Sequence, residues 1–150
     1  MVVATETDAS PEPTREDLLA FSAFADAFSE LDFRAGEWVR PSTCEDGVIQ
    51  VGWWSPSATV AEWEQALYAR NIMDPLSDYL DDSNVAFVNQ AIANPSVLVR
   101  IELPRLRRVL TFLARAERHA EGGWYESAFQ SGMAQMATRQ LVEIGSRIGA

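Results

Sequence analysis

Apolar residues recur at intervals of three and four along most of the chain, which is the spacing of helices that bury one face. The first such pattern begins at Thr14, which forms a capping-box pattern with Asp17, and continues to about Asp32. We expect its apolar residues to face the core: Leu18, Phe21, Phe24, Ala25, Phe28 and Leu31. Further helices are predicted at about 59–71, 84–94, 104–120 and 124–148, and Gly132 can interrupt the last of these.

Residue types at the predicted helix ends agree with these ranges. Thr59 with Glu62 repeats the capping-box pattern, and Asn84 is a good N-cap. Pro104 suits the first turn of a helix, because its missing N–H would have no intrahelical partner there. In the helix after Pro104, the predicted buried stripe consists of Leu103, Leu106, Leu110, Leu113, Ala116 or Glu117, and Ala120.

The segment between the first two helices has a different pattern. Gly36, Pro41, Gly47 and Gly52 interrupt it, and Glu45-Asp46-Gly47 has turn chemistry before the β-prone residues 48–51. The fold class expected is therefore mainly α: a compact helical domain of about five helices, spanning 14–150, with a small β-hairpin near residues 37–54. Residues 1–13 are polar and contain two prolines, so they are predicted to be a disordered tail.

Composition agrees with a folded domain, since 47% of the residues are hydrophobic and 23% are charged. The apolar runs are much shorter than the roughly 20 residues that span a bilayer. Residues 1–6 lack the basic start and the apolar stretch of about 7–15 residues that a secretory signal requires. We therefore expect a cytoplasmic protein that does not bind membranes. Cys44 is the only cysteine, so no disulfide can form within the chain.

Charge is unevenly distributed along the chain. The formal net charge is −10: residues 1–99 contain 4 Arg and 17 acids, a net −13, and residues 100–150 contain 8 Arg and 5 acids, a net +3. All 12 basic residues are arginine, which excludes a P-loop lysine, a Schiff base and a lysine general base. With a single histidine, multi-histidine metal sites are also excluded. We expect neither a metal site nor a cofactor.

The sharpest candidate site is a row of side chains spaced three and four apart on one face of the helix 104–120. It comprises Arg105, Arg108, Phe112, Arg115 and His119. Guanidinium groups bind phosphate or carboxylate, and Phe112 could stack on a base, so this row could recognise an anionic ligand. The candidate ligand-binding residues are Arg108, Arg115, Glu117, Arg118 and His119. The alternative, which we favour, is that these arginines pair with the acidic first half of the chain or with a protein partner, and we do not expect nucleic-acid binding.

Three other groups of residues are weaker candidates for a functional site. Cys44 and His119 would need to be adjacent to form a nucleophilic pair, and the acids around Cys44 raise rather than lower a thiol pKa. Asp74, Asp78, Asp81 and Asp82 could bind a hard cation, but their spacing does not match an EF-hand loop and favours a solvated surface. In Trp53-Trp54, one indole is expected to face the core and the other solvent, where it could contact a partner.

The stretch from Leu110 to Gly122, followed by Gly132 and Leu141, resembles the C-terminal signature of a bacterial domain family of unknown function. The resemblance covers Leu110 to Leu141, about the last third of the chain. It implies a shared fold, and it implies no activity because none is known for the family.

From the sequence we predict a small acidic protein that acts as a non-enzymatic protein-interaction or regulatory module, with Trp53 and Trp54 as candidate contact residues. The alternative is an enzyme or small-ligand-binding protein that recognises an anionic ligand through the arginine-rich helix 104–120. The chain lacks a nucleophile, base and orienting group that spacing can identify, so an enzyme is the less favoured reading. The oligomeric state is left open.

Overall fold

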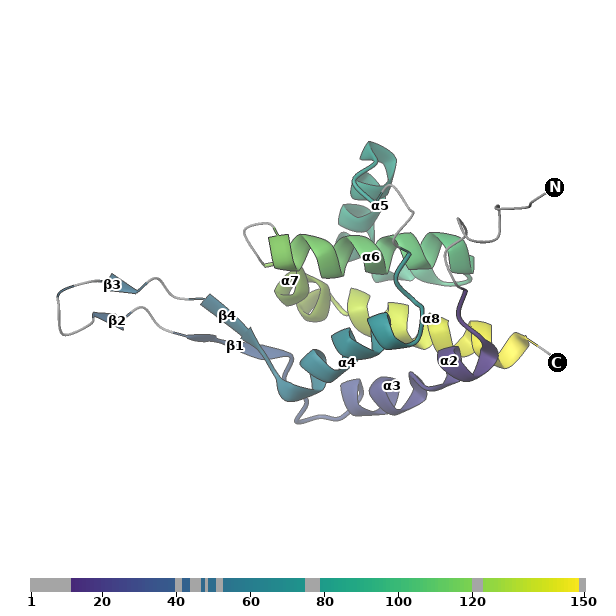
Figure 1. Ribbon diagram of the computed structural model, residues 1–150, viewed down its shortest axis with the longest axis horizontal. Helices are drawn as coiled ribbons and strands as arrows, with labels where there is room; N and C mark the ends of the chain where they lie inside the picture. The colour runs from purple at the N-terminus through teal and green to yellow at the C-terminus, as the bar shows by residue number, and fades with distance from the viewer. Residues whose placement is uncertain are drawn as a thin grey trace, which may run out of the picture.

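The computed structural model describes residues 12–39, 42–43, 47, 49–50, 53–74, 79–119 and 123–148. More than half of these residues are helical, which confirms the mainly α fold class (Figure 1). The helices, in chain order, are α2 (Arg15–Leu19), α3 (Ser22–Phe28), α4 (Ala58–Ala69), α5 (Asp82–Ala93), the short 3₁₀ helix η1 (Pro95–Leu98), α6 (Leu103–His119), α7 (Trp124–Ser131) and α8 (Met133–Arg147).

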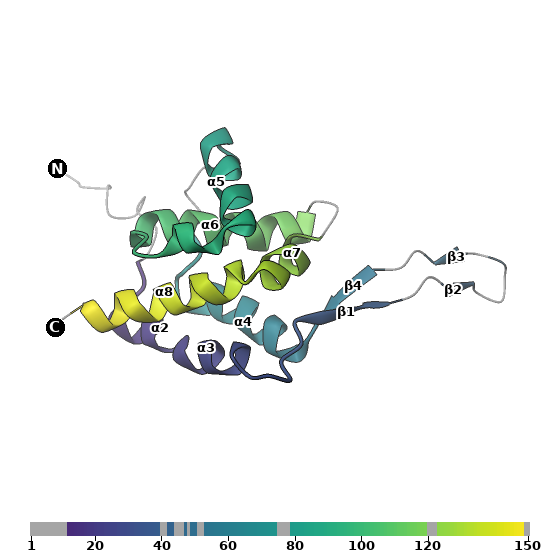
Figure 2. The ribbon, with the colours of Figure 1, turned by 180° about the vertical axis from the view of Figure 1, so that it is seen from behind.

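The core lies around α6 and α8. Helix α8 contacts α2, α3, α6 and α7, and both ribbon views place it between α6 on one side and α2 and α3 on the other (Figures 1 and 2). Helix α6 is buried on most sides, because Val109, Thr111 and Ala114 are buried together with Leu106, Leu110 and Leu113. Four residues that were expected to be buried, Phe28, Leu106, Leu110 and Leu113, share one core with Trp63.

The predicted hairpin is present and projects from the helical body. Strand β1 (Gly36–Val39) pairs antiparallel with β4 (Trp53–Pro56), and β2 (Ser42–Thr43) pairs with β3 (Ile49–Gln50). Both pairs have the same register, so they are two parts of one hairpin. We call these four strands the hairpin arm. Figures 1 and 2 show β2 and β3 at its far end, away from the described helices.

The first predicted helix is divided in two. Helix α2 ends at Leu19, and α3 begins after Phe21, which remains buried at the junction. Leu31 was expected to face the core, but its side chain is fully exposed. Helix α3 ends at Phe28, so Leu31 lies outside the helix and is not on the face that the helical spacing predicted. The break expected at Gly132 is confirmed, because its φ of 90° ends α7 in a left-handed conformation that glycine adopts readily.

Helix caps follow the prediction at one end and differ at two others. The capping box of Thr14 and Asp17 is present. Helix α4 is capped by Ser57, whose hydroxyl accepts a hydrogen bond from the Val60 N–H, and not by Thr59. Helix α5 is capped by Asp81, whereas Asn84 is buried inside the helix and donates to the carbonyls of Tyr79 and Arg108.

Some expectations about the fold, including the burial of Ala120, concern residues beyond the described part of the chain. The proposed disordered tail, 1–13, lies almost wholly outside it, and so does the turn at Glu45-Asp46. Within the described residues, no helix is both long enough and apolar enough to cross a membrane.

Candidate functional site

The arginines of α6 contact aromatic rings. The guanidinium carbon of Arg105 lies 3.8 Å from the Phe87 ring centre, that of Arg115 lies 5.3 Å from the Tyr79 ring centre, and that of Arg118 lies 5.8 Å from the Tyr68 ring centre. All three distances fall within the range of about 6 Å for cation–π contacts. Aromatic partners for these arginines were not considered from the sequence.

Phe112 is not available to stack on a ligand. Its side chain is buried and packs edge-on against Trp124, with ring centres 4.8 Å apart. The expected row of arginines and Phe112 is therefore not one open surface. In addition, no residue of α6 lines either of the two cavities described below.

Arg108 is exposed and lies near Asp81. Hydrogen bonds from the Ser83 hydroxyl and backbone N–H lower the pKa of Asp81, and the positive charge of Arg108 lowers it further. Among the described residues, no ion pair within 4 Å involves Arg105, Arg108, Arg115 or Arg118.

Glu117, a candidate ligand-binding residue, caps a helix. Its Oε1 accepts a hydrogen bond from the backbone N–H of Tyr125, 2.8 Å away, in the first turn of α7. The Tyr125 hydroxyl donates to Glu64 Oε1 over 2.7 Å. Burial raises the pKa of Tyr125, and the hydrogen bond to Glu64 and the charges of Glu64 and Glu117 raise it further. This arrangement is a structural junction between α4, α6 and α7.

Arg107 was missed by the sequence analysis. It is buried, and its guanidinium donates to three successive backbone carbonyls: Nε to Ile72 over 3.1 Å, and Nη2 to Asn71 and to Met73 over 3.2 Å each. The adjacent Thr111 hydroxyl accepts a hydrogen bond from the Asp74 N–H. The sequence does contain a pattern that could have identified it. Arg107 lies four residues after Leu103 and three before Leu110, so it is on the same helix face as these leucines and is expected to point inward.

The remaining sequence candidates are not brought together in the part of the chain that can be described. Cys44, Asp78 and the His119 side chain lie outside it. Asp81 caps α5 and Asp82 occupies its first turn. No group of three or more His, Cys, Asp or Glu residues within the described ranges is placed to hold a metal ion.

The hairpin arm carries three tryptophans on its two faces. Trp38 and Trp54 are directly opposite each other in the β1–β4 register, and Trp53 is opposite Val39. Because neighbouring residues of a strand point to opposite faces, Trp53 lies on the other face from Trp38 and Trp54. The Trp54 side chain packs partly against the core, whereas the side chains of Trp38 and Trp53 are 59% and 51% exposed.

Trp38 and Trp54 face α7. The indole N–H of Trp38 donates a hydrogen bond to the Glu126 carboxylate. Gly36 permits the close approach of Trp54, because a Cβ at that position would lie 2.5 Å from Trp54 Cζ2 and 2.4 Å from the Ser55 carbonyl oxygen. No other residue type would fit there without moving β4.

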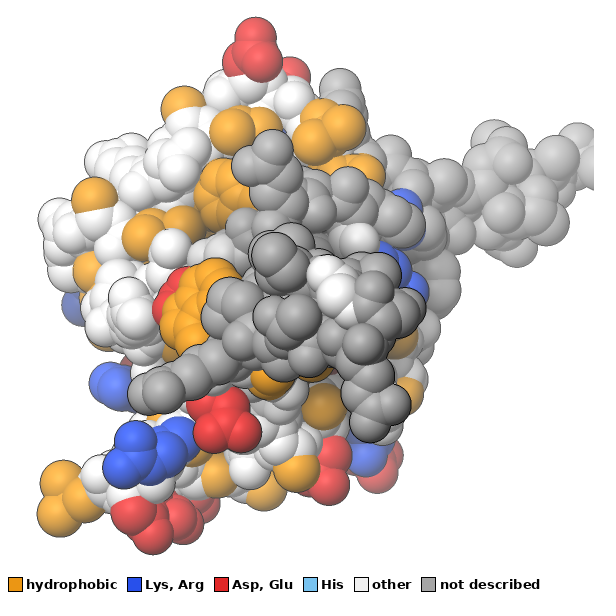
Figure 3. Space-filling model, turned by 90° about the vertical axis from the view of Figure 1, so that its left-hand side faces the viewer, with side chains coloured by type: hydrophobic (Ala, Val, Ile, Leu, Met, Phe, Trp, Pro, Cys, Tyr) orange, Lys and Arg blue, Asp and Glu red, His pale blue; other side chains and the backbone are white. Residues whose placement is uncertain are grey.

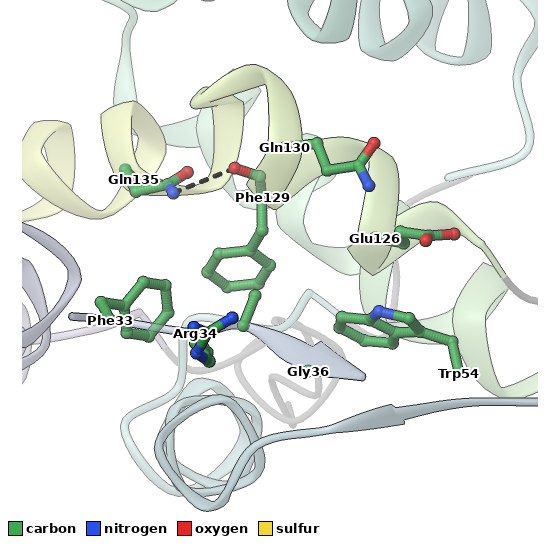
Figure 4. Close-up of a pocket in the computed structure, with 9 residues that line it drawn as sticks. Phe33, Arg34, Gly36, Trp54, Glu126, Phe129, Gln130 and Gln135 are labelled. Carbon is green, nitrogen blue, oxygen red and sulfur yellow. Dashed lines mark hydrogen bonds between the residues drawn. The ribbon is translucent and has the colours of Figure 1, made fainter. Parts of the chain in front are cut away.

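A cavity of about 310 Å³ lies between the arm and the helices α7 and α8, and we call it the arm-base pocket. Its lining residues are Phe33, Arg34, Ala35, Gly36, Trp54, Glu126, Phe129, Gln130 and Gln135. Figure 4 shows Phe33, Arg34 and Trp54 along one side, and Glu126, Phe129 and Gln130 along the opposite side. A smaller cavity of about 180 Å³ adjoins it and shares Arg34 and Gly36. The sequence analysis identified Trp54 but not the other residues of this pocket.

Comparison with curated proteins and with solved structures gave no significant match. A protein-family model does match the chain, over residues 13–147. The match includes the hairpin arm, the arm-base pocket and all described helices, so the likeness is not limited to the last third of the chain, as the resemblance at 110–141 suggested. The chain therefore belongs to the family of unknown function DUF6508.

Proposed function

We propose that this protein is a non-enzymatic protein-interaction module and that the hairpin arm carries its contact surface. The observation that supports this is the exposure of Trp38 and Trp53, whose indoles lie on opposite faces of the arm. Tryptophan is among the residues that most often dominate binding energy at protein interfaces, because it combines a large apolar area with a hydrogen-bond donor.

The architecture of the hairpin arm also favours the binding of a partner protein. A two-stranded hairpin alone is marginally stable in water, and a third strand, a helix or another surface normally covers one of its faces. The β1–β4 pair has α7 beside it, but the β2–β3 pair lies away from every described helix (Figures 1 and 2). A bound protein would supply the missing cover.

The partner expected from charge is a protein with a basic surface around an apolar patch. The whole chain has a formal net charge of −10, which attracts such a partner and repels a second copy at long range. Seen from the hairpin end, exposed hydrophobic side chains are interspersed with acidic and arginine side chains (Figure 3). A mixed surface of this kind is typical of non-obligate interfaces.

The test compares two equally exposed apolar residues, one on the arm and one on the body. Trp53 is 51% exposed and Val99 is 50% exposed. The wild type, Trp53→Ser and Val99→Ser would be used as tagged baits in native cells, and captured proteins would be quantified by mass spectrometry. We expect a basic protein whose capture by Trp53→Ser falls about tenfold or more while Val99→Ser retains it. Binding of the purified pair would then be measured directly. Equal capture by all three baits would contradict the proposal.

The alternative proposal, recognition of an anionic ligand by the α6 arginines, is less well supported. Arg105, Arg115 and Arg118 contact three different rings, and Phe112 is buried. An anion that bound Arg105, Arg115 or Arg118 would therefore have to compete with these contacts.

A further inference from the structure

We propose that the arm-base pocket binds a small planar monocarboxylate, with Arg34 as the carboxylate anchor and Trp54 as the stacking surface. This inference is independent of the protein partner proposed above, because it concerns the pocket at the root of the arm and not the exposed indoles. It rests on the shape of the cavity, on its unused hydrogen-bond donors and on the balance of charges around it.

The cavity suits a flat ring. Phe33 and Phe129 form an apolar wall, with ring centres 6.1 Å apart, and the Trp54 indole forms another surface of the cavity (Figure 4). Gly36 leaves the space that allows this indole to lie so close to β1. The volume of about 310 Å³ is at the lower end of the range of about 300–1,000 Å³ found for ligand pockets, so one or two fused rings fit better than a larger molecule.

Two donor groups of the pocket have no acceptor among the described residues, whereas the amide N–H of Gln135 donates to the Phe129 carbonyl. No described residue accepts a hydrogen bond or an ion pair from the Arg34 guanidinium, or a hydrogen bond from the Trp54 indole N–H. Gln130 adds an exposed amide to the rim. A guanidinium forms two parallel hydrogen bonds with a carboxylate, which gives both affinity and orientation.

The charges around the cavity limit the ligand to a single negative charge. Arg34 is the only cationic residue among the lining residues, and Glu126 contributes one negative charge. The Glu126 carboxylate accepts a hydrogen bond from the Trp38 indole N–H, and this bond holds the carboxylate beside Trp38. A phosphate dianion would be repelled by Glu126 with only one guanidinium to compensate, whereas a carboxylate can pair with Arg34 alone.

The experiment titrates the purified full-length protein with benzoate, benzylamine and benzyl alcohol, which share a ring and differ in charge. Binding is followed by the NMR signals of the five tryptophan indole N–H groups. The Trp54 signal is assigned as the one missing from Trp54→Phe. We expect benzoate to shift this signal saturably at concentrations up to about 10 mM, and to do so more strongly than either other probe.

Two arginine variants test the anchor. Arg34→Gln should weaken benzoate binding by about tenfold, because it removes a charge-assisted bidentate contact. Arg139→Gln removes the same charge from an exposed site on α8 and should bind benzoate as the wild type does. Circular dichroism of both variants controls for folding. Preferential binding of benzylamine, equal benzoate affinity in Arg34→Gln and wild type, or no saturable shift would each overturn the proposal.

Discussion

Trp38 donates its indole hydrogen bond to Glu126, which lies 88 residues further along the chain. This bond joins the hairpin arm to the first turn of α7, on the side where Trp38 and Trp54 lie together. The arm is thereby fixed to the helical body near its root, and the arm-base pocket lies beside this connection.

The first prediction concerns this connection. Trp38→Phe keeps an aromatic ring but removes the N–H donor, so β1 should separate from α7 more often. We expect a loss of about 1 kcal/mol or less in the free energy of unfolding, because the bond is exposed, together with faster hydrogen exchange in the β1–β4 ladder. Trp53→Phe, on the other face, is the matched control and should leave the exchange rates unchanged. Equal exchange in the two variants would show that the bond does not hold the arm.

Buried Arg107 should contribute strongly to stability. Arg107→Met leaves the carbonyls of residues 71–73 without their donor, and each unsatisfied buried carbonyl costs about 1–3 kcal/mol. Since some of these groups can reach water after local rearrangement, we expect a total loss of about 2–4 kcal/mol in urea unfolding. Exposed Arg139→Gln is the control and should change stability by about 0.5 kcal/mol or less. A similarly small effect of Arg107→Met would mean that these hydrogen bonds are replaced by water at little cost.

Tyr125 should make stability depend on alkaline pH. Its pKa is raised in the folded protein, whereas in the unfolded chain it titrates near 10. Below about pH 10 the hydroxyl is protonated in both states and its contribution is fully present; above that pH only the unfolded state releases the proton, so stability falls. Unfolding free energies measured from pH 7 to 11 should show this decline in the wild type and a weaker decline in Tyr125→Phe. Tyr68→Phe, on the surface, is the control, and an unaltered decline in Tyr125→Phe would assign the pH effect to other groups.

The α6 arginines should affect stability modestly and should not bind nucleic acid. Changing Arg108 and Arg115 together to glutamine removes the positive charge near Asp81 and the contact with the Tyr79 ring. We expect a loss of about 0.5–1 kcal/mol from the contact with Tyr79, and a further small loss at Asp81 that disappears in high salt because Arg108 and Asp81 are both exposed. The wild type should show no binding to DNA or RNA at physiological ionic strength. Submicromolar, salt-dependent binding that the double variant loses would instead favour an anion-binding surface on α6.

Part of the arm could have been predicted in more detail from the sequence. Trp38 lies eight residues before Asp46 (38 to 46) and Trp54 eight residues after it (46 to 54), so a hairpin centred on the predicted Glu45-Asp46-Gly47 turn places them opposite each other. The sequence analysis predicted the hairpin but did not apply this symmetry. It therefore identified Trp53 and Trp54 as contact residues and missed Trp38.

The helix caps show a limit of local reasoning. Ser57 and Thr59 are both good N-cap residues, as are Asp81 and Asn84, and each pair is only a few residues apart. In both cases the earlier residue caps the helix and the later one lies inside it. Asn84 is held inside α5 by the carbonyl of Arg108, a residue of a different helix, so its role depends on helix packing.

The sequence alone determined the helices, the hairpin and most core residues, because these depend on apolar spacing and turn residues within a few positions of one another. Only the tertiary structure decided what the polar residues do when their partners lie on another element, whereas the local capping box of Thr14 and Asp17 could be read from the sequence. Glu117 caps α7, Arg107 binds the carbonyls of residues 71–73, and Glu126 binds Trp38. In each case the hydrogen-bonding partner lies on another element. A hydrogen bond forms only when packing brings donor and acceptor within about 3 Å of each other. The spacing of residues along the chain does not give the distance between residues on different elements.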